Sequence, residues 1–200
     1  MIAVPEGLRE EEIIPYLRRT GIAERSALSP EERLARSAAA CERIANSLVF
    51  AGAETVMIYN SVRGELSLEP LLAHPAAADK RFVYPLCVTR TEMKAYAPGG
   101  WQRGVFGIRE PVPELSREIE PERIDLVICP CTVFDDMGRR IGMGAGYYDR
   151  FLPLCSRAAV IAAAFERQKA RMIPARLWDC PMDAVFTERR IYAAKKGRLS

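Results

Sequence analysis

The chain has 200 residues, of which 49% are hydrophobic, and its formal net charge at pH 7 is +3. This length and apolar content are enough for one sizeable core, and the sequence predicts a single domain over residues 1–200. The small charge, interspersed with acids, gives no support for nucleic-acid binding. No apolar run approaches the roughly 18 residues of a membrane span, and the start of the chain lacks the pattern of a secretory signal. We therefore expect a cytoplasmic protein with no membrane segment.

The cysteines, the single histidine and the basic residues near the end of the chain point to no site of their own. None of the six cysteines forms the Cys-x-x-Cys pair typical of zinc and redox sites, and we interpret them as reduced core thiols. His74 stands where a helix is expected to end, so no triad built on histidine is favoured. Lys195, Lys196 and Arg198 are interpreted as a solvated tail.

The first elements predicted along the chain are two helices. Residues 10–19 form the first, with apolar side chains on one side. The second has a strong start, because Ser29 is a capping residue, Pro30 occupies the first helical position and Glu32 stands three residues after the cap. Its apolar residues recur at helical spacing as far as about Phe50.

Short apolar runs of strand length follow these helices. The runs are 55–59, 82–88, 124–129, 159–165 and 184–187, and helical stretches at 68–73, 147–154 and 168–172 alternate with them. Such alternation is typical of an α/β domain, so we predict three layers, a largely parallel sheet with helices on both faces, similar to a Rossmann fold. Residues 110–121 are expected to be an irregular connection.

A glycine-rich loop at residues 134–150 is the most informative stretch of the sequence. Gly142, Gly144 and Gly146 occupy alternate positions and leave bare backbone N–H groups open to a ligand. A helix is expected to begin directly afterwards, and the N-termini of helices favour anions. Phosphate is therefore the predicted ligand of the loop. Arg140 can add positive charge to this cradle, and Asp149 can hold a magnesium ion on the phosphates.

Other interpretations of the glycine loop stay open at this point. A Walker loop is not favoured, because no Gly-Lys followed by Ser or Thr is present. A dinucleotide-binding fingerprint has some support from Glu166, which stands about 20 residues after the loop, where a ribose-binding acid belongs. That fingerprint follows a strand directly, whereas about a dozen residues separate Cys129 from Gly142. Tight turns and bulges also use glycine for structural reasons alone.

The wider sequence resembles the 5-formyltetrahydrofolate cyclo-ligase family. The loop of that family typically reads Phe-Asp-x-x-Gly-x-Arg-x-Gly-x-Gly-x-Gly-Tyr-Tyr-Asp, and residues 134–149 match every fixed position. The resemblance continues in family order over nearly the whole chain, through residues 17–19, 27–33, 65, 106–111, 164–168, 173–174, 178–179 and 183–188. Chance similarity in one loop does not explain a match of this extent.

The resemblance implies a reaction, its substrates and its partners. ATP and magnesium drive the conversion of 5-formyltetrahydrofolate to 5,10-methenyltetrahydrofolate through a phosphorylated formyl intermediate, with release of ADP and phosphate. The expected partners are therefore 5-formyltetrahydrofolate and ATP, and the expected protein is a monomer or weak homodimer. The alternatives are a paralogue that binds folate or nucleotide with weak or no activity, and an isomerase or transferase on a similar scaffold.

The resemblance also implies a set of site residues. ATP is expected to contact Arg18 and the loop residues Arg140, Ile141, Gly142, Met143, Gly144, Ala145, Gly146, Tyr147 and Tyr148, with the helices of residues 8–51 contributing to this site. Folate is expected to contact Asn60, Glu65 and the loop residues Met143, Gly144, Ala145, Gly146 and Tyr147. Asp149 and Asp179 are the candidate magnesium ligands, and Arg140 and Tyr147 are the candidate catalytic residues.

Individual positions add physical detail to this hypothesis. One carboxylate at Glu65 can accept both a ring N–H and the adjacent amino group of a pterin, whereas a solvated acid is the alternative. Trp178 and Phe106 are candidate aromatic walls or ordinary core residues. Relatives usually carry a phosphate-contacting lysine where this chain has Ile14. A lysine there is expected to face the same cleft as Arg18, one helical turn away.

Overall fold

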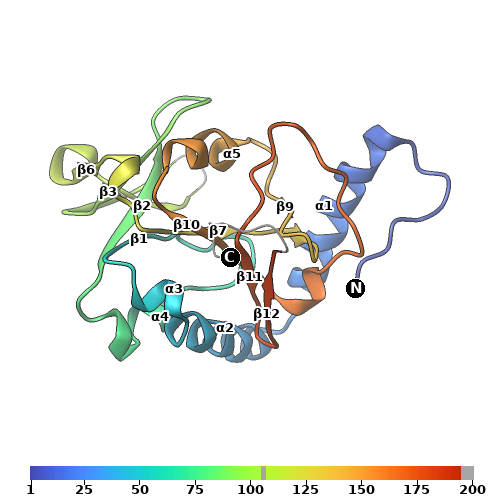
Figure 1. Ribbon diagram of the computed structural model, residues 1–200, viewed down its shortest axis with the longest axis horizontal. Helices are drawn as coiled ribbons and strands as arrows, with labels where there is room; N and C mark the ends of the chain where they lie inside the picture. The colour runs from blue at the N-terminus through green and yellow to red at the C-terminus, as the bar shows by residue number, and fades with distance from the viewer. Residues whose placement is uncertain (105–106, 195–200) are drawn as a thin grey trace.

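The computed structural model describes residues 1–104 and 107–194, which are built around a mixed sheet (Figure 1). Within these residues the main sheet has eight strands in the order β12-β11-β10-β7-β1-β2-β3-β6. They are β1 (Thr55–Met57), β2 (Arg81–Cys87), β3 (Met93–Ala97), β6 (Arg117–Ile119), β7 (Leu126–Pro130), β10 (Ala159–Ala163), β11 (Ala184–Phe186) and β12 (Ile191–Ala193). The strands from β11 to β2 are parallel, and the pairings at both edges are antiparallel. Phe106, Lys195, Lys196 and Arg198 lie outside the described residues.

Helices cover both faces of this sheet, as Figure 1 shows. α2 (Pro30–Ala45), α3 (Leu48–Ala51) and α4 (Glu69–Leu72) lie on one face, and α5 (Tyr147–Phe151) lies on the other. α1 (Glu10–Ser26) lies beside the sheet, against a small hairpin of β8 (Val133–Phe134) and β9 (Arg140–Ile141). A second hairpin joins β4 (Trp101–Arg103) to β5 (Arg109–Pro111). The predicted layered α/β fold is confirmed, and no helix in the described residues is long and apolar enough to cross a membrane.

The central parallel strands β7 and β10 are apolar along their whole length because both faces are covered. In β7, Leu126 and Ile128 join the cluster beneath α2, whereas Val127 and Cys129 join the cluster beneath α5. Strands buried on both faces read as continuous apolar runs and not as alternating patterns. This explains why the central strands were predictable from the sequence.

The edges of the sheet differ from the sequence prediction. Residues 110–121 were expected to be irregular, yet they contain the end of β5 and all of β6, and β3 and β12 were not predicted either. The three antiparallel strands β3, β6 and β12 are three to five residues long and carry exposed or half-exposed side chains. Strands this short with one solvated face contain too few consecutive apolar residues to be predicted from the sequence.

Two helical predictions are also corrected. Residues 168–172 are not a helix: a single 3-10 turn occupies Glu166–Gln168, and two isolated β-bridges follow, from Lys169 to Phe134 and from Ala170 to Ile2. The second predicted helix ends at Ala45 instead of near Phe50. The side chain of Ser47 accepts a hydrogen bond from the Phe50 N–H and starts α3, which breaks the longer helix in two.

The cysteines and the histidine largely follow their interpretation. Cys41, Cys129, Cys131 and Cys155 are buried, and burial raises the pKa of each thiol to about 12, so these thiols are neutral at physiological pH. Cys87 is an exception and is exposed. The ring of His74 begins a 3-10 turn, because its Nδ1 accepts a hydrogen bond from the Ala76 N–H at 3.1 Å. The predicted role at a helix end is confirmed.

A close backbone contact seats α1 against the residues that follow β7. A Cβ atom on Gly21 would lie 2.3 Å from the Thr132 carbonyl oxygen and 2.4 Å from Cγ2 of Val133. Only glycine lets the helix approach this near. The close approach of α1 to Thr132 therefore depends on Gly21.

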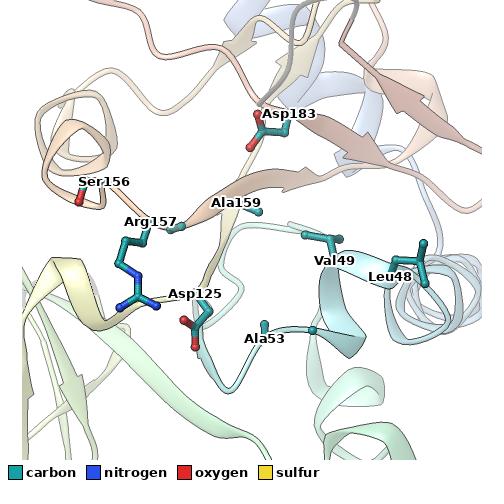
Figure 2. Close-up of a pocket in the computed structure, with 10 residues that line it drawn as sticks. Leu48, Val49, Ala53, Asp125, Ser156, Arg157, Ala159 and Asp183 are labelled. Carbon is teal, nitrogen blue, oxygen red and sulfur yellow. The ribbon is translucent and has the colours of Figure 1, made fainter. Parts of the chain in front are cut away.

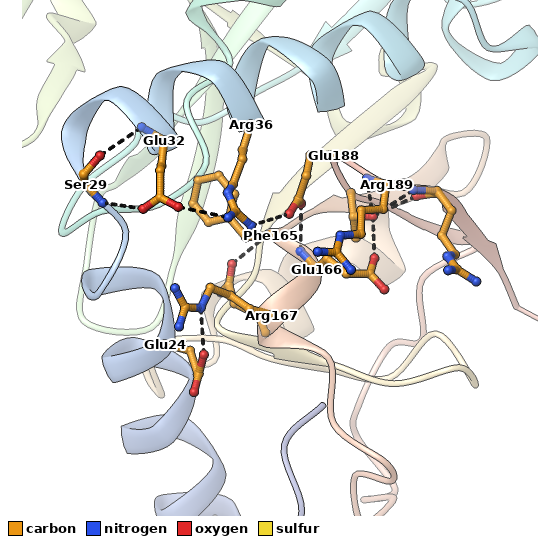
Figure 3. Close-up of polar contacts among 12 residues, drawn as sticks. Glu24, Ser29, Glu32, Arg36, Phe165, Glu166, Arg167, Glu188 and Arg189 are labelled. Atoms are coloured by element: carbon orange, nitrogen blue, oxygen red, sulfur yellow. Dashed lines mark hydrogen bonds and ion pairs between the residues drawn. The ribbon is translucent and has the colours of Figure 1, made fainter.

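A polar network holds α2 to the rest of the fold (Figure 3). Ser29 and Glu32 exchange hydrogen bonds and form the predicted cap, and Glu32 also pairs with Arg36 at 3.1 Å. Arg36 reaches Glu188 at 3.0 Å, and the Glu188 carboxylate accepts from the Glu166 N–H at 2.8 Å. Part of the family resemblance therefore lies in residues that stabilise the fold.

Gly21→Ala is predicted to lower the free energy of unfolding by about 1–3 kcal/mol, the usual cost of forcing extra atoms into a packed contact. Urea denaturation measures this change. Gly52→Ala is the control, because a Cβ there meets nothing nearer than the Leu48 carbonyl oxygen at 3.4 Å. Equal stability of the two variants would show that α1 can shift away from Thr132 without cost.

Candidate active site

The glycine loop lies at the carboxyl edge of the parallel strands. Beyond the end of β7, the Thr132 N–H donates to the Ile141 carbonyl oxygen at 2.8 Å and brings the start of the loop back to the sheet. The neighbouring strand β1 leads into residues 60–65 at the same edge. β1 pairs with β2 on one side and with β7 on the other, so the crevice between β1 and β7 is a switch point in strand order. Open α/β sheets bind ligands at such a point.

The loop itself presents unpaired backbone donors. Gly144 and Gly146 have φ angles of +107° and +69°, which favour glycine over any residue with a side chain. The N–H groups of residues 142–146 donate no hydrogen bond within the described part of the chain. Unpaired N–H groups in consecutive turns form a concavity that suits an anion.

The first half of the motif builds the turn that supports this loop. The buried carboxylate of Asp135 accepts hydrogen bonds from the N–H groups of Met137, Arg139 and Ile173 at 2.9–3.1 Å, and from Arg139 Nε at 2.9 Å. Gly138 has a φ of +74°, and a Cβ there would lie 2.4 Å from the Met182 carbonyl oxygen. Asp135 and Gly138 are therefore structural residues.

Arg18 brings positive charge from α1 to the loop. Its Nε donates to the Gly142 carbonyl oxygen at 2.9 Å, and its Cζ lies 3.4 Å from where a Cβ of Gly144 would stand. Burial lowers the pKa of Arg18, and the positive charge of Arg176 lowers it further. A cation whose charged form is destabilised beside free N–H groups favours an anion nearby.

Ile14 lies in an apolar part of the interface between α1 and the hairpin. Ile14 is buried, with 6% of its surface exposed, in an apolar cluster that includes Leu17, Val133 and Ile141. This cluster lies between α1 and the β8–β9 hairpin. The expectation that a lysine at position 14 would face the same cleft as Arg18 stays a prediction.

Arg140 and Tyr148 carry polar atoms that lack a partner. Arg140 Nη2 donates to Asp149 Oδ1 at 3.0 Å, and the guanidinium lies 5.4 Å from the centre of the Tyr148 ring. Arg140 Nε and the Tyr148 hydroxyl are buried without a hydrogen-bond partner among the described residues. Burial raises the pKa of Tyr148 well above its usual value, so the hydroxyl keeps its proton. A buried donor without a partner costs about 1–3 kcal/mol, which a bound ligand can offset.

The candidate magnesium ligands lie near one another. Burial raises the pKa of Asp179, and the negative charge of Asp149 adds to this rise. No group of three or more His, Cys, Asp or Glu side chains in residues 1–104 and 107–194 is arranged to hold a metal alone. Two carboxylates fit magnesium only if phosphate oxygens and water complete its shell, which is the usual arrangement for this ion.

Glu65 is not the solvated acid of the alternative interpretation. It is 7% exposed, and its Oε2 accepts from the Val62 N–H at 3.1 Å. Its Oε1 lies 3.4 Å from Nη1 of Arg25. Burial raises the pKa of Glu65, while the charge of Arg25 opposes this rise.

Arg25 was missed by the sequence prediction. It is fully buried on α1, beyond residue 19, where the predicted helix stopped. Leu17, Gly21 and Arg25 recur at helical spacing along the inner face of the observed helix. This spacing indicates that Arg25 lies on the inner face of the helix. Arginine is rarely fully buried, so its presence at an apolar position suggested that the amphipathic helix had already ended.

Two predicted site residues have their polar groups bound elsewhere. The Asn60 side chain donates to the Arg109 carbonyl oxygen, and the Tyr147 hydroxyl donates to the Thr89 carbonyl oxygen at 3.1 Å. Both side chains donate to backbone carbonyl oxygens. The folate contact of Asn60 and the catalytic role of Tyr147 stay predictions.

Trp178 and Glu166 resolve two of the open alternatives. Trp178 is 66% exposed, so its interpretation as a core residue is wrong. Glu166 accepts hydrogen bonds from the hydroxyl groups of Thr187 and Tyr192. Its carboxylate is part of the scaffold, and the dinucleotide interpretation loses the acid that supported it.

A hollow of about 260 Å³ lies at the opposite, amino edge of the sheet (Figure 2). Leu48, Val49, Arg157 and two aspartates line it. Asp125 accepts from the N–H groups of Glu54 and Thr55, and Asp183 accepts from the Val160 N–H at 2.8 Å. These carboxylates cap strands, so the hollow is a packing feature apart from the glycine loop.

Comparison with known proteins decides the family. The model of the 5-formyltetrahydrofolate cyclo-ligase family matches residues 12–188. The chain belongs to this family. It is 29% identical over 175 residues to the 5-formyltetrahydrofolate cyclo-ligase of Escherichia coli (strain K12), covering 84% of this chain and 96% of the relative. The Mus musculus 5-formyltetrahydrofolate cyclo-ligase is 26% identical over 180 residues, covering 81% of this chain and 87% of the relative.

A solved structure of a relative has the same fold as this cyclo-ligase family member. The NMR structure of Aquifex aeolicus 5,10-methenyltetrahydrofolate synthetase superposes with a TM-score of 0.80 at 29% identity, covering 94% of this chain and 95% of that one. The similarity includes the segments that position the glycine loop, since the superposition spans nearly the whole of both chains.

Asp135→Asn is predicted to destabilise the protein by about 1.5–3 kcal/mol, because hydrogen bonds to a charged group are lost where water cannot replace them. Equilibrium unfolding in urea gives this value. Asp136→Asn is the matched control, since its neighbouring carboxylate is exposed and forms only an ion pair with Lys169. If both variants unfold at the same urea concentration, Asp135 is not the centre of the turn.

Proposed function

We propose that this protein converts 5-formyltetrahydrofolate to 5,10-methenyltetrahydrofolate at the β1–β7 crevice, with ATP as co-substrate and magnesium. One observation carries the proposal: a loop of free N–H groups suited to phosphate and a buried carboxylate suited to a pterin meet at Arg25. The loop contributes Met143 to this meeting point, and the end of β1 contributes Glu65. Family membership supports the same reaction.

The chemistry explains why the reaction needs ATP. The oxygen of a formamide is a poor leaving group, so it first attacks the γ-phosphorus of ATP; the new O–P bond forms as ADP leaves. The neighbouring secondary amine then attacks the activated carbon, the C–O bond breaks, phosphate departs and the amine loses its proton. Such phosphoryl transfer asks the protein chiefly to position groups and to neutralise charge.

Backbone N–H groups and arginines are the proposed phosphate ligands. The free N–H groups of residues 142–146 and the side chain of Arg18 surround the same point of the loop. α5 is only five residues long, so its dipole adds less than the expected full helix. Phosphate recognition would therefore rest on the loop and on arginine. Donors fixed before the reaction stabilise developing charge without reorganisation.

Glu65 is the proposed anchor of the folate. As a carboxylate it can accept the ring N–H and amino group of the pterin together. The protonated hydroxyl of Tyr148 is a further donor without a partner among the described residues. Both groups are buried, so water competes little with the ligand for their hydrogen bonds.

Asp149 and Asp179 are the proposed residues that hold magnesium on the phosphates. The ion would neutralise phosphate charge during transfer. Arg140 holds Asp149 in place through a 3.0 Å ion pair, which leaves the other carboxylate oxygen for a metal-bound water or the metal.

The direct test is the absorbance of 5,10-methenyltetrahydrofolate formed from 5-formyltetrahydrofolate. Product should appear with equimolar release of phosphate, and it should stop when ATP is omitted or magnesium is removed by a chelator. Binding of 5-formyltetrahydrofolate without release of phosphate would instead identify a non-catalytic paralogue.

Glu65→Gln is predicted to weaken binding of 5-formyltetrahydrofolate by about 10-fold to 100-fold, because it removes a charged hydrogen bond of roughly 1.5–3 kcal/mol. Affinity for ATP should change little. Titration of each ligand separates the two effects, with the exposed Glu54→Gln as the control. Unchanged folate affinity would remove Glu65 from the substrate site.

A further inference from the structure

Arg25 joins three segments that the chain order keeps apart. Its Nε donates to the Arg63 carbonyl oxygen at 3.1 Å, and its Nη1 lies 3.4 Å from Glu65 Oε1, both beyond β1. The same Nη1 reaches the Cys131 carbonyl oxygen beyond β7 at 3.5 Å, and Nη2 lies 3.7 Å from the Met143 sulfur in the glycine loop. The guanidinium therefore lies at the switch point itself.

Stability alone does not account for an arginine in this place. Arg25 has no exposed surface, and Glu65 is the carboxylate with which it pairs. Removing two charges from water costs several kcal/mol per ion, and apolar residues of similar volume often replace such pairs with no loss of stability. A buried pair at the carboxyl edge of a sheet points to a function for the charge.

We propose that Arg25 is a positioning residue that holds the Glu65 carboxylate for the pterin of the folate and links it to Met143 of the glycine loop. This inference rests on the proposed role of Glu65 as the folate anchor. Arg25 contacts Oε1 of Glu65 and the Val62 N–H donates to Oε2, so both oxygens have a partner before the substrate arrives. A carboxylate that is oriented in advance loses less entropy when the ligand binds.

The charge on Glu65 depends on the groups that face it. These are Arg25 from α1, Arg63 from the same loop, Tyr59 from the end of β1, Cys131 from beyond β7 and Tyr148 from α5. Burial raises the pKa of both tyrosines well above its usual value and that of Cys131 to about 12, so all three are neutral around pH 7. The two arginines are the cations that favour the ionised carboxylate.

The sign of the pH effect follows from this arrangement. Burial raises the pKa of Glu65, and Arg25 is the largest influence that opposes the rise. Without Arg25 the pKa rises further, so the carboxylate gains a proton at a higher pH. The ionised form binds the pterin, and folate affinity in a variant without Arg25 should therefore be lost at a higher pH than in the parent.

The experiment compares Arg25→Met with the parent, with Glu65→Gln and with the double variant. Arg25→Met should weaken binding of 5-formyltetrahydrofolate by about 10-fold to 100-fold at neutral pH, with part of the loss recovered as pH rises. Arg25→Met should add little in the Glu65→Gln background, because residues that act through one contact are not additive. Arg19→Met, an exposed arginine on the same helix, is the control and should match the parent.

A lysine variant covers the case in which Arg25→Met does not fold. Arg25→Lys keeps one charge near Glu65 but lacks the planar fork that reaches all four acceptors. It should bind folate with intermediate affinity and keep the parent's pH profile. Folate affinity equal to the parent's in a folded Arg25→Lys or Arg25→Met would overturn the inference.

The outcomes separate this inference from the proposed function. If Glu65→Gln leaves folate affinity unchanged, the folate assignment of the site is wrong. If Glu65→Gln weakens binding but Arg25→Met does so additively and with no shift in pH profile, only the positioning role of Arg25 is wrong. An equal loss of ATP and folate affinity in Arg25→Met at every pH would likewise show a purely structural residue.

Discussion

The packing of α1 against the residues that follow β7 is the contact on which the rest of the candidate site depends. Gly21 permits the approach, because a Cβ would lie 2.3 Å from the Thr132 carbonyl oxygen. One turn before it, Arg18 reaches the glycine loop, and one turn after it, Arg25 reaches Glu65. A single close backbone contact thus fixes Arg18, on the proposed phosphate side, and Arg25, on the proposed folate side, relative to each other.

The glycine motif combines two kinds of residue. Asp135 and Gly138 build a buried turn, whereas Gly144 and Gly146 leave backbone donors free. Four hydrogen bonds converge on the Asp135 carboxylate, and a turn held in this way supports the loop that carries the free donors. The motif that identifies the family therefore contains residues that build the turn as well as residues of the candidate site.

The central fold was predictable from the sequence, and its edges were not. Continuous apolar runs revealed the five parallel strands, because each is covered on both faces. The antiparallel strands β3, β6 and β12 are short and partly solvated, and the helix predicted at residues 168–172 is replaced by a 3-10 turn and isolated β-bridges. Local pattern does not distinguish these cases, because pairing with distant segments decides them.

For the site, the sequence by itself determined the family, the glycine loop and the identity of Glu65 as a candidate anchor. It did not reveal that Glu65 is buried and paired with Arg25, that Ile14 faces an apolar cluster, or that the Tyr147 hydroxyl is already bonded to a distant carbonyl. Each of these three features depends on which segments of the chain meet in the folded structure. Residue type and spacing specify what a side chain can do, whereas only the tertiary structure decided which partner each polar group has, because burial and pairing arise between segments far apart in the chain.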